Sequence, residues 1–218
     1  MTTSDTVLLE SLCEAGRRLH ARNLLAGADG NLSCRMADGT IAITPSGRAK
    51  DRLVPGDMAF LGPEGRILSG APSTERLMHL TVYARCPGAR VVVHAHPPTA
   101  IAWSVARPDL RALPSDVLPE LVLAAGEVPI VPYARPGTPS MGEVLEPFLP
   151  DHRLVILSRH GALSWGEDVE EACRGMERVE HVCLILKSAL ELGGLSTLSP
   201  VEVKALRAMR AKAGGRLL

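Results

Sequence analysis

Two histidines separated by a single residue, His94 and His96, are the first feature of the sequence that could do chemistry. They follow the apolar run Val91-Val92-Val93, which favours a buried strand. Because side chains two residues apart leave the same face of a strand, both imidazoles can chelate one ion. Chance is a real alternative, since 7 histidines in 218 residues give about 0.2 such pairs at random. Taken alone, the pair is equally well explained by buried, hydrogen-bonded histidines.

A third histidine, His160, completes a possible set of ligands. It follows Val155-Ile156-Leu157 and precedes Gly161, which predicts the end of a buried strand where the backbone can turn sharply. Ligands often bind at strand ends in open sheets. Three imidazoles with an open fourth position are typical of a catalytic zinc ion, whereas structural zinc sites are normally closed. His160 could instead simply end its strand, but the joint pattern favours a metal site.

Three short segments are rich in small residues, hydroxyl groups and free backbone N–H groups, which suit a phosphate: Gly30-Asn31-Leu32-Ser33, Thr44-Pro45-Ser46-Gly47 and Pro72-Ser73-Thr74-Glu75. Ser73 and Thr74 also open a helix predicted over residues 73–85, whose N-terminal amides favour an anion. Glu75 falls in the first turn of that helix. Ordinary capping and turn chemistry explains each segment by itself at least as well.

Hydrophobic periodicity predicts the elements that must position these residues. We expect an amphipathic helix that ends near Asn23, a hairpin that turns at Asp38-Gly39, and a second hairpin that turns at residues 62–65. Later elements are expected as strands at 91–94, 128–133 and 154–158, a long helix at 169–190 and a last helix after Ser199-Pro200. This order predicts an α/β fold in which helices cover both faces of a mixed central β-sheet, in one domain spanning residues 1–218.

Composition limits the classes of partner. Lys+Arg and Asp+Glu both number 24, so the zero formal net charge gives no general argument for binding nucleic acid or a membrane surface. The five cysteines are scattered and form no CxxC pair, as expected for reduced thiols. No stretch approaches the roughly 18 apolar residues needed to span a bilayer. We therefore expect a cytoplasmic protein.

The ordered set of motifs resembles the class II aldolase/adducin family over roughly Leu8 to Leu190. The resemblance implies a divalent ion, Zn²⁺ or else Mn²⁺ or Co²⁺, on His94, His96 and His160. It implies Glu75 as the catalytic acid/base and a homotetrameric assembly. It also implies a site for the phosphate of a sugar or sugar-like substrate, formed by Gly30, Asn31, Ser46, Gly47, Ser73 and Thr74.

The activity that the resemblance implies is that of a zinc-dependent aldolase. Such an enzyme cleaves a ketose phosphate similar to fuculose 1-phosphate into dihydroxyacetone phosphate and an aldehyde, through a metal-stabilised enediolate. A sugar-phosphate 4-epimerase or a decarboxylase would use the same residues, so both stay open. A non-catalytic adducin-like binding domain is a further alternative, but it would be expected to lack the histidines.

Three positions depart from the family pattern or are left open by it. Glu120 aligns with a tyrosine that protonates the leaving aldehyde in the best-known aldolase, which leaves the aldehyde-side proton donor unassigned. Arg159 stands where many relatives carry asparagine. His79 follows Glu75 by four residues, on the same face of the predicted helix, and we interpret it as an orienting or structural residue.

Overall fold

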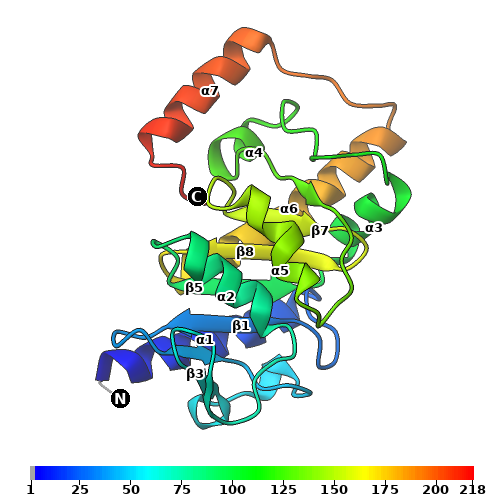
Figure 1. Cartoon of the computed structure of the whole chain (residues 1–218). Helices are drawn as coiled ribbons and strands as arrows, with labels where there is room; N and C mark the ends of the chain where they lie inside the picture. Colours follow the sequence, from blue (N-terminus) through cyan, green and yellow to red (C-terminus); the bar gives the residue numbers. More distant parts are fainter. Residues whose placement is uncertain (1–2) are drawn as a thin grey trace.

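The computed structural model describes residues 3–218, and its centre is one eight-stranded sheet (Figure 1). The strand order is β4-β3-β2-β1-β5-β8-β7-β6, and the only parallel neighbours among the described strands are β6 and β7. The sheet is therefore mixed, as predicted. Its strands are β1 (Asn31–Arg35), β2 (Ile41–Ile43), β3 (Ala59–Leu61), β4 (Ile67–Ser69), β5 (Val91–Ala95), β6 (Ile130–Val131), β7 (Leu154–Leu157) and β8 (Gly161–Gly166).

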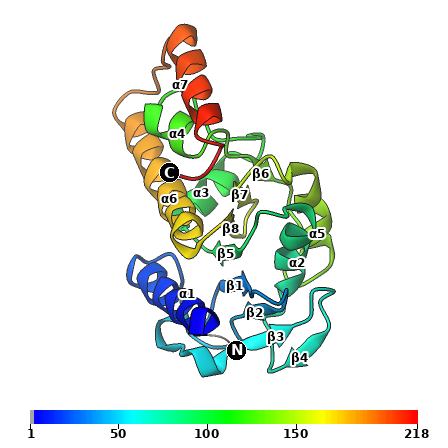
Figure 2. The ribbon, with the colours of Figure 1, turned by 90° about the vertical axis from the view of Figure 1, so that its left-hand side faces the viewer.

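Helices cover both faces of the sheet. In Figure 2, α1, α3 and α6 lie on one side and α2 and α5 on the other, while α4 and α7 pack together beyond one edge. The α-helices are α1 (Thr3–Ala21), α2 (Arg76–Arg85), α3 (Pro98–Ala106), α4 (Pro119–Ala124), α5 (Ser140–Leu145), α6 (Val169–Glu191) and α7 (Pro200–Lys212). Three short 3₁₀ helices complete the fold: η1 (Lys50–Arg52), η2 (Pro55–Asp57) and η3 (Glu146–Phe148).

Alternation along β5 shows why the protein has a core on each face of its sheet. Val91 and Val93 belong to the core beneath α1 and α6, whereas Val92 belongs to the core beneath α2 and α5. This follows from the two-residue period of a strand. His94 has the parity of Val92, so its imidazole lies on the α2 side of the sheet.

The sequence predicted both early hairpins and the terminal helices correctly. β1 and β2 pair across the Asp38-Gly39 turn, and the β3–β4 connection is closed by a hydrogen bond from Gly65 N to Gly62 O. The first helix ends at Ala21, close to the predicted Asn23, and α6 and α7 lie where they were expected. These elements are fixed by local turn chemistry and helical periodicity.

Two predicted boundaries are wrong. The helix expected from Ser73 begins at Arg76, because the Ser73 N–H donates to Thr44 O at 3.2 Å and holds this segment against the end of β2. The strand expected over residues 128–133 is only two residues long, because Pro129 and Pro132 have no N–H with which to continue the ladder. Sequence patterns did not predict β8, which completes the pairing of β5 and β7.

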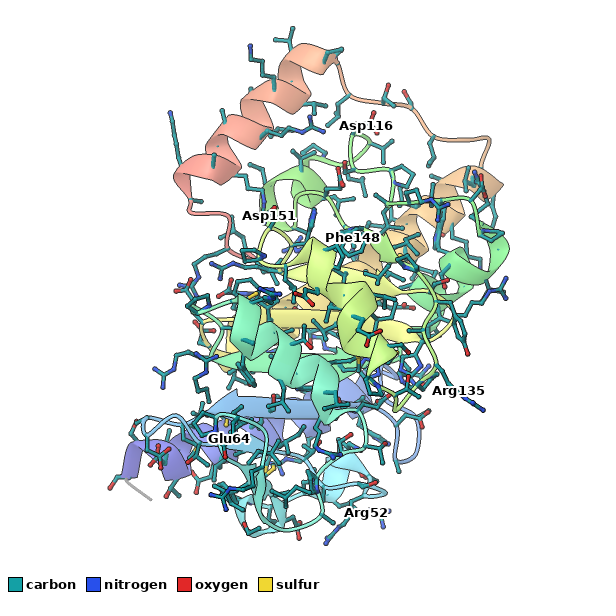
Figure 3. The ribbon with its side chains drawn as sticks, viewed as in Figure 1. Arg52, Glu64, Asp116, Arg135, Phe148 and Asp151 are labelled. Atoms are coloured by element: carbon teal, nitrogen blue, oxygen red, sulfur yellow. The ribbon has the colours of Figure 1, made fainter. Side chains whose placement is uncertain are left out.

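Charged side chains of both signs lie around the outside of the molecule, as Arg52, Glu64 and Arg135 show in Figure 3. This distribution agrees with the zero formal net charge of the chain. Within residues 3–218, none of the helices combines the length and the apolar character needed to cross a membrane.

Candidate metal and active site

Three imidazoles converge where β5 ends and β7 turns into β8. The Nε2 atom of His94 lies 3.1 Å from Nε2 of His96 and 3.0 Å from Nε2 of His160. Antiparallel pairing of β5 with β8 brings them together, since it sets Ala95 opposite Ala162, two residues after His160. The three histidines are the metal-ligand cluster found among the described residues.

The ring nitrogens suit a metal ion. Nδ1 of His94 lies 2.9 Å from Ala162 O, so it carries the proton and leaves the lone pair of Nε2 facing the other rings. Two nitrogen ligands at about 2.1 Å from a tetrahedral zinc would lie about 3.4 Å apart, close to the separations observed. Burial lowers the pKa of both His94 and His96, which favours the neutral, metal-binding form.

Gly161 allows β8 to lie close to β5, whereas the sequence pattern predicted that this glycine permits a sharp turn of the backbone. A Cβ atom at Gly161 would lie 2.5 Å from Ala95 O and 2.8 Å from Cε1 of His94, so any side chain would push β5 away. The sharp turn itself is made by Arg159, whose φ of 59° is in the left-handed region. Asparagine adopts this region more readily than arginine, which gives a physical reason for the asparagine of the family pattern.

Glu75 faces the cluster from the residue before α2. Its Oε1 lies 3.0 Å from Nε2 of His160, its Oε2 lies 3.4 Å from Nε2 of His94, and Nδ2 of Asn31 donates to Oε2 at 2.8 Å. Burial by itself would raise the pKa of Glu75, but its hydrogen bonds with His160 and Asn31 lower it below its ordinary value. The carboxylate is therefore ionised at neutral pH.

A directional chain of hydrogen bonds orients Asn31 behind Glu75. The Asn31 amide N–H faces the carboxylate, so Oδ1 is left to accept from Nε2–H of His79 at 2.5 Å. Nδ1 of His79 must then accept from the Ser33 hydroxyl at 2.7 Å, and Ser33 in turn accepts from the Tyr83 hydroxyl at 2.8 Å. His79 is fully buried, and burial lowers its pKa to about 4, which keeps it neutral. This supports the interpretation of His79 as an orienting residue.

A cavity of about 260 Å³ opens beside Glu75 and the histidines. All six residues expected to bind a phosphate line it: Gly30, Asn31, Ser46, Gly47, Ser73 and Thr74. Two contacts hold their segments together, namely the bond from Ser73 N to Thr44 O and the bond from Ser46 N to Ala71 O at 3.0 Å. This cavity can therefore hold the anionic group of a ligand and place the rest of that ligand beside the imidazoles.

Sequence reasoning missed two charged residues of this cavity. Asp29 lies at its mouth, with Oδ2 3.4 Å from Nδ1 of His96. Lys50 lines it from η1, although its side chain is almost entirely buried. A lone lysine in a loop is normally exposed, so nothing in the sequence indicated this burial. Glu120 is on the exposed side of α4 and does not line the cavity.

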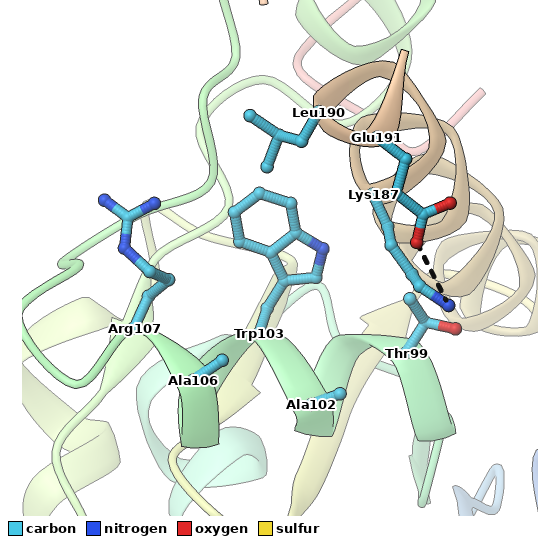
Figure 4. A pocket seen from close by; sticks show the side chains of 8 residues that line it. All are labelled: Thr99, Ala102, Trp103, Ala106, Arg107, Lys187, Leu190 and Glu191. Carbon is cyan, nitrogen blue, oxygen red and sulfur yellow. Dashed lines mark ion pairs between the residues drawn. The ribbon is translucent and has the colours of Figure 1, made fainter. Parts of the chain in front are cut away.

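A second hollow is apolar and unrelated to the histidines. It has a volume of about 330 Å³ between α3 and the end of α6, where Trp103 stands beside Leu190, and Lys187 pairs with Glu191 (Figure 4). Among the described residues that line it, there is no histidine and no buried carboxylate. The chemistry of the described residues is therefore concentrated in the first cavity.

Comparison with known proteins gives one consistent family. A family model, the Class II Aldolase and Adducin N-terminal domain, matches residues 10–186. A 3-oxo-tetronate 4-phosphate decarboxylase of Escherichia coli K12 is 32% identical over 82% of this chain and 85% of its own. A methylthioribulose-1-phosphate dehydratase of Methylococcus capsulatus is 34% identical over 78% of this chain and 88% of its own.

A solved structure supports the same relationship. The crystal structure of YgbL from Escherichia coli, described as a candidate aldolase/epimerase/decarboxylase, superposes with a TM-score of 0.88. It is 29% identical, and the match covers 94% of this chain and 100% of YgbL. The fold predicted from sequence is thereby confirmed.

Proposed function

The chain belongs to the class II aldolase and adducin family, and from this premise we propose that it is a metal-dependent lyase that removes carbon dioxide from a phosphorylated 3-oxo sugar acid. The similarity to a 3-oxo-tetronate 4-phosphate decarboxylase over most of both chains supports this choice of reaction. It revises the expectation of an aldol cleavage, which stays the second candidate.

The observation that carries the proposal is that one largely buried carboxylate, Glu75, lies against the imidazoles of His94 and His160. Loss of carbon dioxide from a 3-oxo acid leaves an enolate, and its carbon then gains one proton. Aldol cleavage also requires a base to take the hydroxyl proton of the departing aldehyde. Among the described residues that line the cavity, the only other carboxylate is Asp29, which is 54% exposed and pairs with His96. One proton transfer therefore suits this site better than two.

His94, His96 and His160 would hold the ion, for which we propose Zn²⁺, with Mn²⁺ and Co²⁺ as alternatives. A divalent ion there would supply Lewis-acid stabilisation of the negative charge that develops on the substrate carbonyl. Glu75, ionised at rest, would relay a proton from water to the enolate carbon: it is 13% exposed, so water can reach it, and Asn31 fixes its orientation. Gly30, Asn31, Ser46, Gly47, Ser73 and Thr74 would receive the substrate phosphate.

Aldol cleavage of a ketose 1-phosphate is the second candidate, because it passes through the same kind of enolate. YgbL is likewise described as a candidate aldolase, epimerase or decarboxylase. An epimerase would break the same carbon–carbon bond and then form it again. A non-catalytic adducin-like role is disfavoured, since this chain has kept three converging imidazoles and the carboxylate beside them.

The test is to incubate the zinc-loaded protein with 3-oxo-tetronate 4-phosphate and to measure carbon dioxide release in a closed cell. We expect release that stops with a chelator and falls about 10²- to 10⁴-fold in Glu75→Gln, because the carboxylate that relays the proton is lost. Glu64→Gln is the matched control, since it makes the same change at an exposed residue of the β3–β4 turn outside the cavity, and it should keep full activity.

Parallel reactions with ketose 1-phosphates and with methylthioribulose 1-phosphate separate the alternatives. Dihydroxyacetone phosphate from a ketose 1-phosphate, without carbon dioxide from the oxo acid, would replace the decarboxylase with the aldolase. Loss of water from methylthioribulose 1-phosphate would replace it with a dehydratase. A protein that binds zinc but converts none of these substrates would refute all three reactions.

We also propose that residues 1–218 form one domain and that the protein acts in the cytoplasm as a homotetramer. All five cysteines are buried and unpaired, which supports a reducing compartment. The tetramer is expected from the family resemblance alone. Light scattering behind size-exclusion chromatography should give about four times the 23.2 kDa chain mass.

A further inference from the structure

The cavity contains a buried lysine, Lys50, that makes no direct ion pair with an acidic side chain among the described residues. Lys50 is only 2% exposed, and it takes part in none of the ion pairs within residues 3–218. Its Nζ donates to Ala28 O at 2.5 Å and to Arg48 O at 2.9 Å. Both hydrogen-bond partners are neutral carbonyl groups, and Asp29 and Glu75 act on the ammonium only from beyond ion-pair distance. Burial of an ammonium group without a direct ion-pair partner is unfavourable, and it lowers the pKa of Lys50.

Those two hydrogen bonds join Lys50 to the chain beside two of the segments that line the cavity. Ala28 precedes the Gly30-Asn31 segment, and Arg48 follows the Ser46-Gly47 segment, so Lys50 ties both proposed phosphate loops together. An ammonium group has three N–H donors, and the two carbonyl groups use two of them. Because Lys50 also lines the cavity, its third donor and its charge are available to a ligand there.

The packing of α1 fixes this placement. A Cβ atom at Gly16 would lie 2.7 Å from Lys50 O and 3.2 Å from Lys50 Cβ, so the close contact between α1 and η1 requires glycine. The backbone of Lys50 is therefore held against α1, and its side chain runs inward from there. Such preorganisation is typical of a side chain that binds a ligand, and it would be unusual for a solvated surface lysine.

Neighbouring charges make the Lys50 ammonium distinctive. Arg48, in the same loop, is 55% exposed and pairs with Asp57 at 3.0 Å, so its charge is already neutralised away from the cavity. The two carboxylates of the cavity, Asp29 and Glu75, both lie beside the histidines. Lys50 is thus the only lysine or arginine among the described residues that line this cavity.

We propose that Lys50 is the charged donor of a phosphate subsite, which binds the phosphate monoester of the substrate and determines specificity for phosphorylated over unphosphorylated compounds. The phosphate supplies the counter-charge, and the hydroxyl and amide groups of the Ser46-Gly47 and Ser73-Thr74 segments complete its hydrogen bonds. The inference deepens the proposed function and rests on its phosphate site, but it does not depend on which bond is broken.

The experiment compares the binding of inorganic phosphate to the zinc-loaded wild type, Lys50→Met and Lys50→Gln, from the thermal-unfolding midpoint against phosphate concentration. Loss of a charge-assisted hydrogen bond should weaken phosphate binding about 10- to 100-fold in both variants. Lys50→Gln retains N–H groups that can still bond a loop carbonyl, so it separates the lost charge from the lost bridge between loops. Circular dichroism and zinc content identify variants that have not folded.

Arg48→Gln is the matched control, since it removes one positive charge from the same loop, and it should change phosphate affinity less than about 2-fold. For any substrate turned over, Lys50→Gln should raise KM with little change in kcat, and the unphosphorylated analogue should be unaffected. An equal loss with that analogue would assign Lys50 to the substrate carboxylate and overturn the proposal. Phosphate binding equal to wild type in a folded Lys50 variant would also overturn it.

Failure of the proposed function is distinguishable from failure of this inference. If the wild type itself does not bind phosphate, the phosphate site of the proposed function is wrong, and Lys50 has no such ligand. If the wild type binds phosphate through Lys50 but releases no carbon dioxide, the inference stands and the decarboxylase assignment fails.

Discussion

Replacement of the buried His79 with glutamine should reduce the loss of folding stability that the protein shows as the pH falls from about 6.5 to about 4. Burial lowers the pKa of His79 from 6.5 to about 4, because the neutral ring bonds Ser33 and Asn31 away from water. The unfolded chain therefore binds a proton on His79 between these pH values, while the folded chain does not. Stability from the neutral ring is complete above about pH 6.5 and is lost as the pH falls towards 4.

The magnitude follows from the same two values. A pKa difference of this size corresponds to about 3 kcal/mol in total, and about 2 kcal/mol of it is lost by about pH 5. At about pH 8, His79→Gln should be less stable than wild type by about 1–3 kcal/mol, because the hydrogen-bond chain behind Glu75 is broken. The difference between the two proteins should therefore shrink by about 2 kcal/mol on going from pH 8 to pH 5.

Urea unfolding of the chelator-treated proteins at both pH values measures this difference. His94 and His96 titrate in both proteins, so their contributions cancel to first order. His181→Gln, at an exposed position on α6, is the control for replacing a histidine with glutamine. A difference between wild type and His79→Gln that stays constant from pH 8 to pH 5 would refute the assignment of a neutral, buried His79.

Three further predictions concern the cluster and the turn beside it. His96→Gln should lower zinc retention after dialysis by at least about 10-fold, measured by elemental analysis, whereas an unchanged zinc content would remove His96 from the ligand set. Gly161→Ala should destabilise the fold by about 1–3 kcal/mol in urea unfolding, since the new Cβ meets Ala95 O at 2.5 Å, and a neutral effect would show that β5 and β8 can separate freely. Arg159→Asn should raise stability by about 0.5–1 kcal/mol, because asparagine tolerates the φ of 59° better; a loss of stability would mean that the exposed arginine makes contacts that outweigh this backbone preference.

Local patterns in the sequence determined several features of this protein. The apolar run Val91-Val92-Val93 predicted a buried strand that ends in histidines, and Asp38-Gly39 predicted the first hairpin. The family resemblance also grouped six residues, expected to bind a phosphate, that the structure places around one cavity. These predictions succeed because turn chemistry and side-chain alternation depend only on residues close together in the chain.

Only the tertiary structure decided how these parts meet. His160 reaches His94 across 66 residues because β8 pairs with β5, and the sequence pattern had not predicted β8. The orientation of Asn31 depends on His79 in α2, and the burial of Lys50 depends on Gly16 in α1. Such burial of polar groups is offset by contacts with distant elements, so it is a property of the packed molecule and leaves no local signal in the sequence.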